Sequence, residues 1–403
     1  MKKRMLSIFM AFCMVFPLAV TAGASPLNDS PESTFNITVV DEQGNAIPSP
    51  KISLYSYLDK QVVLNTTAST SGSCKLHYTP TVDPDKMSKL NAEQGSTEDV
   101  LYADYMIYVS KPGYQDELYT LTKTFSPSGK IDCDAANQGD ITITMKPSTI
   151  SASKKTSSDP IYQYLVNTGK ISDESPIYIL QPEDTIELQK QGVISSVTPK
   201  ASFTNINNVN VPVGEFHVVK GATLNVKFYT SDSLKVQSKA DSGSGWSVSG
   251  SVSRNFSETA SYAPFSITAD TAGRKKVYYV MGDFIKETTY ITGGQVRQVM
   301  RLNKLRASTA VSATSICNTC MKSYSSVSNN DGLIRTVNPN SHIVYGKGKT
   351  VSLGLSASVS GISLGVTRTT KTSTEIKCSN SSSKTLKMYD KGTNEAVYHM
   401  THN

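Results

Sequence analysis

The chain has 403 residues, of which 40 are basic and 33 acidic, and its formal net charge at pH 7 is +7. Beyond residue 24 no apolar stretch approaches the roughly 20 residues of a membrane-spanning helix, which excludes a protein with several such spans. The five histidines are scattered, and no H-E-x-x-H, G-x-S-x-G or P-loop pattern occurs, so the enzyme classes marked by those motifs are excluded.

The N-terminus has the three parts of a secretory signal peptide. Residues 2–4 are basic, an apolar run interrupted only by Ser7 follows, and Ala22-Gly23-Ala24 offers a cleavage site. Residues 1–24 are therefore predicted to be a signal peptide that is removed near Ala24. We expect the mature protein to be secreted and extracellular, with association to the cell wall as one form of retention.

Charge is distributed unevenly along the mature chain. Residues 25–147 carry 16 acidic and 9 basic side chains, a net charge of −7, whereas residues 148–403 carry 17 acidic and 28 basic ones, a net charge of +11. This asymmetry indicates a polyanionic partner for the second half, such as teichoic acid, an anionic membrane or nucleic acid. Simple solubility, or attraction between the two halves of the same chain, also explains it and is slightly favoured, because the density of charge is modest.

The first folded region is predicted over residues 35–147. Its short β-rich runs, bounded by Gly, Pro and Asp, are typical of a β-sandwich rather than of βαβ units. The expected strands are residues 35–41, 51–55, 74–78, 105–109 and 141–145.

Two segments of this region carry a family resemblance. They are Val-Asp-Glu-Gln-Gly-Asn-Ala-Ile-Pro at residues 40–48 and Tyr-Val-Ser-Lys-Pro-Gly-Tyr at residues 108–114. In their order among the strands, they resemble the carboxypeptidase-regulatory-like and Cna-B-type domains of Gram-positive secreted proteins. The resemblance implies a seven-stranded transthyretin-like β-sandwich that serves as a spacer or binding module rather than as an enzyme. It does not extend to the C-terminal half.

Residues 148–200 are predicted to form a semi-ordered linker. Residues 148–158 are rich in Ser, Thr and Lys, whereas apolar residues cluster at 162–166 and 177–180. We expect those two clusters to dock on a neighbouring part of the chain.

A second, basic antiparallel β domain is predicted over residues 201–403. Apolar and polar residues alternate in several stretches, as in strands with one apolar face. These stretches are residues 224–229, 234–237 and 246–253. A further hairpin is expected to turn at Gly293-Gly294. The expected fold class is therefore all-β, a transthyretin-like β-sandwich followed by a second antiparallel β-rich domain.

Residues 351–370 give the sharpest hairpin prediction. If Ser360-Gly361 is a two-residue turn, one face of the hairpin is apolar and the other is small and polar. The apolar pairs are then Val359 with Ile362, Ala357 with Leu364 and Leu355 with Val366, and the polar pairs are Ser358 with Ser363, Ser356 with Gly365 and Gly354 with Thr367. Such a hairpin packs its apolar face on another sheet, which we favour, or inserts in a membrane as the stem of a β-barrel pore.

Five cysteines remain after cleavage of the signal peptide, and all are disulfide candidates in an exported protein: Cys74, Cys133, Cys317, Cys320 and Cys378. The expected pairs are Cys74 with Cys133, and Cys378 with either Cys317 or Cys320. A thioredoxin-like use of the Cys317-x-x-Cys320 motif needs a βαβ context that the sequence lacks. A zinc site needs a fourth ligand near Cys317, Cys320 and Cys378.

No catalytic, cofactor-binding or metal-binding residue is assigned from the sequence, and we expect no enzyme activity and no cofactor. The leading hypothesis is a non-catalytic secreted or cell-surface-associated binding protein that contacts an anionic cell-wall polymer, a membrane, a host surface or a protein partner. Nucleic acid and small-molecule substrates are not expected. The alternatives are a pore-forming or membrane-perturbing β-hairpin protein, and a cell-wall hydrolase whose site is not evident in the sequence.

Overall fold

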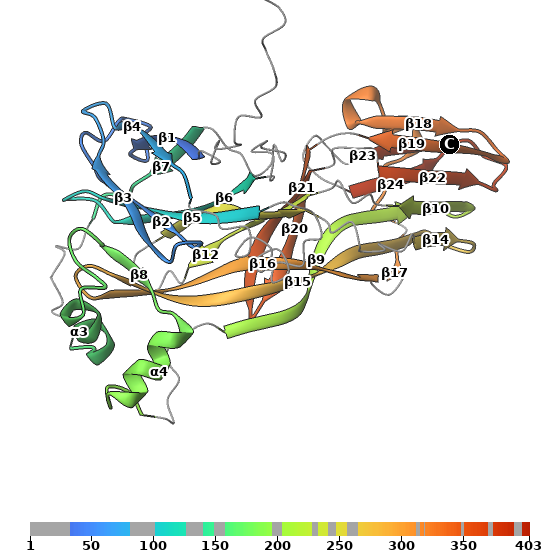
Figure 1. Ribbon diagram of the computed structural model, residues 1–403. Helices are drawn as coiled ribbons and strands as arrows, with labels where there is room; N and C mark the ends of the chain where they lie inside the picture. The colour runs from blue at the N-terminus through green and yellow to red at the C-terminus, as the bar shows by residue number, and fades with distance from the viewer. Residues whose placement is uncertain are drawn as a thin grey trace, which may run out of the picture.

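The computed structural model is all-β apart from two short α-helices in the part of the chain that it describes (Figure 1). That part is residues 33–80, 101–125, 140–148, 158–195, 204–227, 233–240, 247–255, 265–311, 315–317, 319–347, 350–369, 374–390 and 397–403. The expected signal peptide, residues 1–24, lies outside it.

The N-terminal region is a two-layered β structure. Its strands are β1 (Ser33–Val40), β2 (Lys51–Ser56), β3 (Gln61–Thr67), β4 (Ser73–Tyr78), β5 (Leu101–Ser110), β6 (Glu117–Phe125) and β7 (Asp140–Thr144). One layer has the order β4-β1-β7, and the other has the order β6-β5-β2-β3. Alternate residues of β1, such as Phe35, Ile37 and Val39, are buried against Leu54 and Ile107 of the facing layer. This burial is what the alternating pattern predicts.

The connector forms two helices and one strand: α3 (Pro160–Asn167), β8 (Ile177–Ile179) and α4 (Pro182–Lys190). Helix α3 begins where the Asp159 side chain accepts a hydrogen bond from the Ile161 N–H at 2.8 Å. Tyr162 and Leu165 are buried in a small cluster with Tyr290. Ile177 and Ile179 are buried in another cluster, beside Tyr55. Both apolar clusters of the connector therefore dock, as expected, although the helices themselves were not predicted. Among the described residues, no helix has the length and apolarity to cross a membrane.

The remaining strands build the C-terminal half, together with two 3₁₀ turns (Tyr324–Ser326 and Asn329–Asp331). They are β9 (Thr204–Val218), β10 (Ala222–Lys227), β11 (Ser233–Gln237), β12 (Lys239–Ala240), β13 (Ser247–Asn255), β14 (Phe265–Ala269), β15 (Arg274–Ile291), β16 (Gln295–Val311), β17 (Ser315–Ile316), β18 (Leu333–Val337), β19 (Ser341–Lys347), β20 (Thr350–Val359), β21 (Ile362–Thr369), β22 (Thr374–Asn380), β23 (Leu386–Asp390) and β24 (Val397–His402).

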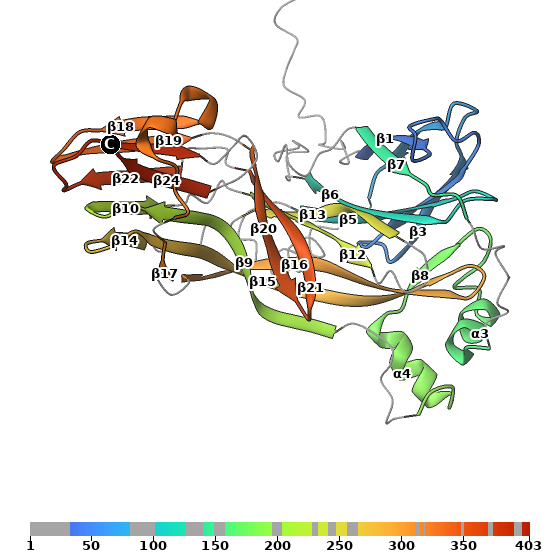
Figure 2. The same ribbon diagram turned by 180° about the vertical axis from the view of Figure 1, so that it is seen from behind.

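Strands β15 and β16 form the expected hairpin, with Gly293 and Gly294 in its turn at positive φ. Strand β15 also pairs with β9, β8 and β17. The hairpin runs beneath the N-terminal layers, and β15 and β9 continue toward the C-terminal sheets (Figures 1 and 2). The β15–β16 hairpin therefore lies against both halves of the chain.

One sheet crosses from the N-terminal region into the C-terminal half. Its order is β20-β21-β11-β13-β6-β5-β2-β3, and the junction is a parallel pairing of β13 with β6. At this junction Gly250 has a φ of +93°, and a side chain there would overlap the backbone of Thr120. The two expected domains thus share a continuous sheet.

The β20–β21 hairpin follows the predicted register only near its turn. Val359 pairs with Ile362, and Ser360 and Gly361 both have positive φ, as a two-residue turn requires. Two predicted pairs are wrong, because Val366 lies opposite Leu353 rather than Leu355, and Thr367 lies opposite Ser352 rather than Gly354. Between Leu353 and Ser356 the ladder has a register shift, a bulge that a sequence-based pairing scheme does not anticipate.

The two faces of this hairpin differ in burial as predicted. Ala357, Val359 and Leu364 are buried in the main C-terminal core. Ser358 and Ser363, on the opposite face, are exposed. The hairpin thus packs its apolar side on other strands of the same protein.

Candidate functional sites

Charged side chains meet in the interior where the two halves of the chain join. Asp104 of β5 is 4% exposed, and Arg254 of β13 donates to its two carboxylate oxygens at 3.0 and 2.7 Å. Arg301 of β16 donates to the same carboxylate at 2.8 Å, and so does the Thr122 hydroxyl. Burial alone would raise the pKa of Asp104, but the two guanidinium groups hold it below its ordinary value.

Arg301 connects this carboxylate to a second one. It donates to Glu287 of β15 at 2.9 and 2.7 Å, and its guanidinium lies 4.2 Å from the ring centre of Tyr57. Burial raises the pKa of Glu287 in spite of the attraction to Arg301. Two arginines of the basic half therefore form ion pairs with Asp104 of the acidic half. Part of the charge asymmetry of the sequence thus serves attraction between the two halves.

An apolar cluster reinforces the same junction. Tyr55, Met106 and Leu118 on the N-terminal side pack with Ile179 and Ile291 on the other. Because sheet pairing, apolar packing and ion pairs all cross the junction, we treat the two halves as one body.

A groove of about 920 Å³ lies beside this junction, between the N-terminal layers and the connector. The charged side chains that line it are Lys51, Lys111, Asp116, Asp173 and Glu174. Hydroxyl groups of β2 and β3 and the ring of Tyr114 complete much of the wall. None of the described residues that line the groove is a histidine or a cysteine.

Asp116 is a partly buried acid in the wall of the groove. Burial raises the pKa of its carboxyl to about 6, although the Tyr108 hydroxyl donates a hydrogen bond to it at 3.2 Å. Across the groove, the Asn65 side chain donates to the backbone carbonyl of Glu174, which ties β3 to the connector. The groove thus offers hydrogen-bonding groups that carry both positive and negative charge. Reasoning from the sequence does not reveal this groove, because its walls come from six segments that are separate in the chain.

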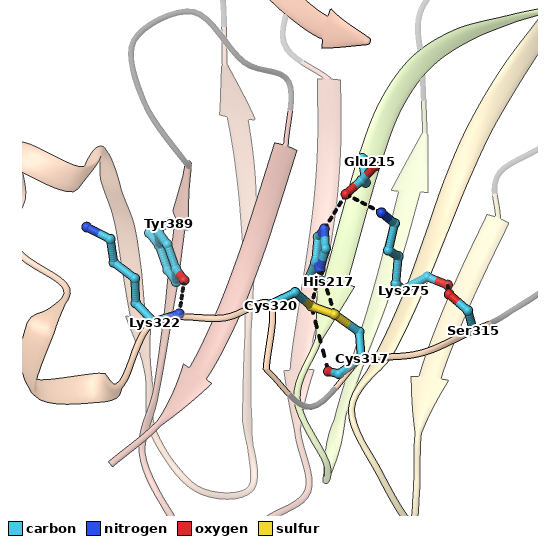
Figure 3. The surroundings of a disulfide bond; sticks show 8 residues. All are labelled: Glu215, His217, Lys275, Ser315, Cys317, Cys320, Lys322 and Tyr389. Carbon is cyan, nitrogen blue, oxygen red and sulfur yellow. Dashed lines mark hydrogen bonds and ion pairs between the residues drawn. A yellow bond between two sulfur atoms is a disulfide. The ribbon is translucent and has the colours of Figure 1, made fainter.

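A second cluster surrounds the Cys317-x-x-Cys320 motif, which follows β17 (Figure 3). The structure joins Cys317 and Cys320 in a disulfide, so the predicted pairing of Cys378 with one of them is wrong. Cys378 faces the core from the middle of β22, opposite Leu224, and burial raises the pKa of its thiol to about 12. Cys74 is a half-buried free thiol, and its predicted partner Cys133 lies outside the described residues.

His217 of β9 lies beside this disulfide. Its Nδ1 atom is 2.6 Å from the Cys320 sulfur and 3.6 Å from the Cys317 sulfur. Its Nε2 atom lies 2.6 Å from Glu215, whose carboxylate also pairs with Lys275 at 2.8 Å. Glu215 and His217 are two residues apart on one strand and therefore share a face.

The surroundings fix this group firmly. The His217 ring stacks on the ring of His399 of β24, with centroids 4.1 Å apart, and Tyr389 stacks on the other side of His399. Burial alone would raise the pKa of Glu215, but hydrogen bonds from His217 and Lys275 lower it to about 2. The spacing of the cysteines does not point to His217, which lies 100 residues before Cys317 in the chain.

No family model matches the chain, and no curated protein matches it in sequence. Among solved structures, 3-chlorocatechol 1,2-dioxygenase from Rhodococcus opacus is 13% identical over 30% of this chain and 62% of that one, with a TM-score of 0.20. Catechol 1,2-dioxygenase from Pseudomonas arvilla is 9% identical over 32% and 57%, with a TM-score of 0.21. BcpA, the major pilin subunit of Bacillus cereus, is 8% identical over 92% and 100%, with a TM-score of 0.18. The chain thus spans less than two thirds of these dioxygenases, and similarities at such TM-scores carry no inference about function.

Proposed function

We propose that this protein is an exported, non-catalytic binding protein whose groove holds a polyhydroxylated chain, of the kind found in cell-wall glycans. The groove of about 920 Å³ beside the junction is the observation that carries the proposal. Its volume lies within the range of ligand sites, and a hydrogen bond from Asn65 to Glu174 joins two of its walls.

The lining favours a neutral polyol over a polyanion. Lys51 and Lys111 are balanced by Asp116, Asp173 and Glu174, so a row of phosphates would meet repulsion as well as attraction. Hydroxyl groups of a sugar both donate and accept hydrogen bonds, so they suit a wall that mixes ammonium and carboxylate groups.

Binding without turnover is also part of the proposal. The partly buried Asp116 accepts the Tyr108 hydroxyl, which suits a role in ordering the wall.

The basic half supports one further candidate, an anionic polymer or membrane. Lys377 of β22 and Lys384 are exposed there. Arg254 and Arg301, however, form buried ion pairs with Asp104, so less positive charge is available at the surface for a partner. The pore-forming alternative has less support, since the apolar face of the β20–β21 hairpin is packed in the core.

The test is co-sedimentation of the mature protein with three particles across a salt series. These are Gram-positive peptidoglycan stripped of teichoic acid, the same walls with teichoic acid, and phosphatidylglycerol liposomes. We expect both wall preparations to capture the protein, and we expect this capture to persist at high salt. Tyr114→Ala should weaken it about 2- to 12-fold, the loss of about 0.5–1.5 kcal/mol of ring contact. The control, Lys377→Ala, should bind normally.

Other outcomes separate the alternatives. Salt-sensitive capture that needs teichoic acid and is weakened by Lys377→Ala would place binding on the basic half and overturn the groove proposal. Salt-resistant capture on liposomes alone would favour membrane insertion. Release of soluble wall fragments over time would show turnover and contradict a non-catalytic role.

A further inference from the structure

Three potential metal ligands converge outside the groove. The Nδ1 atom of His217 and the sulfur atoms of Cys317 and Cys320 all lie within 4.8 Å of one another. His217 is 3% exposed, whereas both cysteines are half-buried and can be reached from solvent. A Cys-x-x-Cys pair with a histidine from elsewhere in the chain is a ligand set that zinc prefers.

The histidine is already oriented as a ligand. A carboxylate cannot donate a hydrogen bond, so the proton between Glu215 and His217 belongs to Nε2 of the imidazole. In the neutral ring, the lone pair of Nδ1 then points at the two sulfur atoms. Histidines that bind metals commonly donate their second N–H to a carboxylate in this way, and Lys275 holds that carboxylate in place.

The loop that carries the cysteines is held at both ends. The Cys317 N–H donates to the Gly273 carbonyl at 3.1 Å. The Lys322 N–H donates to the Tyr389 hydroxyl at 2.6 Å (Figure 3). Tyr389 belongs to the ring stack that also contains His217. Imidazole and loop therefore share a support that does not depend on the disulfide.

The distances suit a tetrahedral ion after a small movement. Zinc bonds of about 2.3 Å to sulfur and about 2.0–2.1 Å to nitrogen place a coordinated nitrogen and sulfur roughly 3.6 Å apart. The Cys317 sulfur is already 3.6 Å from Nδ1, and the Cys320 sulfur, at 2.6 Å, would move outward by roughly 1 Å. Breaking the disulfide permits that movement by rotation of the side chain.

We propose that the reduced form of the protein binds one Zn²⁺ through Cys317, Cys320 and His217, with a fourth position open to water or another ligand. Disulfide and metal exclude each other. A dithiol reductant supplies two electrons and two protons to the disulfide and itself becomes a cyclic disulfide. The two thiols release their protons when the ion binds as a dithiolate complex.

The test begins with mature protein reduced by excess dithiothreitol and desalted without oxygen. Zn²⁺ is then titrated against a chromophoric chelator, and Co²⁺ is used as a spectroscopic probe. We expect one ion per chain, with Co²⁺ giving a sulfur-to-metal absorption band and the d–d bands of a tetrahedral site. The same protein with its disulfide intact should bind no ion at this site.

Variants assign the ligands. Cys320→Ser and His217→Gln, compared in the reduced state, should each lose the ion or lose the tetrahedral spectrum. Cys74→Ser should behave like the parent protein, which excludes Cys74 as a ligand. Far-UV circular dichroism checks that each variant is folded. A folded His217→Gln variant with unchanged affinity and spectrum, or equal binding by the disulfide form, would overturn the proposal.

Discussion

Asp104 of β5 and Arg254 of β13 are 150 residues apart in the chain and form a two-pronged ion pair at 3.0 and 2.7 Å in the interior. One residue comes from the acidic half and the other from the basic half. Because both are almost fully buried, each depends on the other for the hydrogen bonds it would otherwise make with water.

Removal of one partner of this pair should strongly destabilise the protein. Arg254→Met leaves Asp104 buried with a single guanidinium, and we expect a loss of about 3–5 kcal/mol in the free energy of unfolding, measured with urea. Lys60→Ala is the control, because Lys60 and Glu183 form an exposed pair at 3.9 Å, and its cost should be at most about 1 kcal/mol. Equal effects of the two substitutions would contradict the structural role given to Asp104.

Asp116 should make stability depend on pH in the opposite sense to a salt-bridged acid. Its folded pKa of about 6 lies above the roughly 3.9 of an unfolded aspartate, so the folded state holds more protons between these values. Stability is therefore highest when Asp116 is protonated and falls as pH rises from about 4 to about 6. At pH 7 the free energy of unfolding of Asp116→Asn should exceed that of the parent by about 1–2 kcal/mol. At pH 4 the two proteins should be equally stable. Urea titrations at both values test this, and a variant less stable at pH 7 would argue against it.

Much of the fold follows from local pattern. Alternating burial in β1 and the paired glycines of the β15–β16 turn are properties of short segments, and both were predicted correctly. The predicted β20–β21 pairs are wrong on the N-terminal side of Ser356, where the ladder has a bulge. The prediction rests on the alternation of apolar and polar residues, and that alternation does not reveal a bulge. Strands β3 and β6 were missed, since their polar residues give a weak alternating signal.

The two candidate sites depend on contacts between distant segments, which one sequence does not display. The groove takes its walls from β2, β3, the end of β5 with the turn after it, the connector and the turn between β15 and β16. His217 and Cys320 are 103 residues apart, and they come together because β9 and β17 both pair with β15. The pairing of β13 with β6 is equally nonlocal, so it was not foreseen.

The β20–β21 hairpin should behave as part of the core. Leu364→Ala removes a buried side chain and should cost about 2–5 kcal/mol in the free energy of unfolding. Ser358→Lys, on the exposed face, should change it by no more than about 0.5 kcal/mol. Chemical denaturation measures both. A small effect of Leu364→Ala would show that the hairpin is loosely held, as a membrane-inserting stem must be.

Glu215 should act on the metal through His217. Loss of a carboxylate that orients a metal-binding histidine typically weakens affinity about 10- to 100-fold, so Glu215→Gln should weaken Zn²⁺ binding by the reduced protein in this range. The Co²⁺ spectrum should stay tetrahedral, because Glu215 is not itself a ligand in the proposal.

The neighbouring lysines provide a matched pair for the same measurement. Lys275→Met removes the cation that holds Glu215 and should weaken Zn²⁺ binding less than Glu215→Gln does. Lys276→Met should leave it unchanged, because Lys276 reaches the Ser266 carbonyl instead. If Glu215→Gln and Lys276→Met had the same affinity, the carboxylate would have no part in positioning the imidazole. Since loss of His217 would still abolish binding in that case, the two roles can be separated.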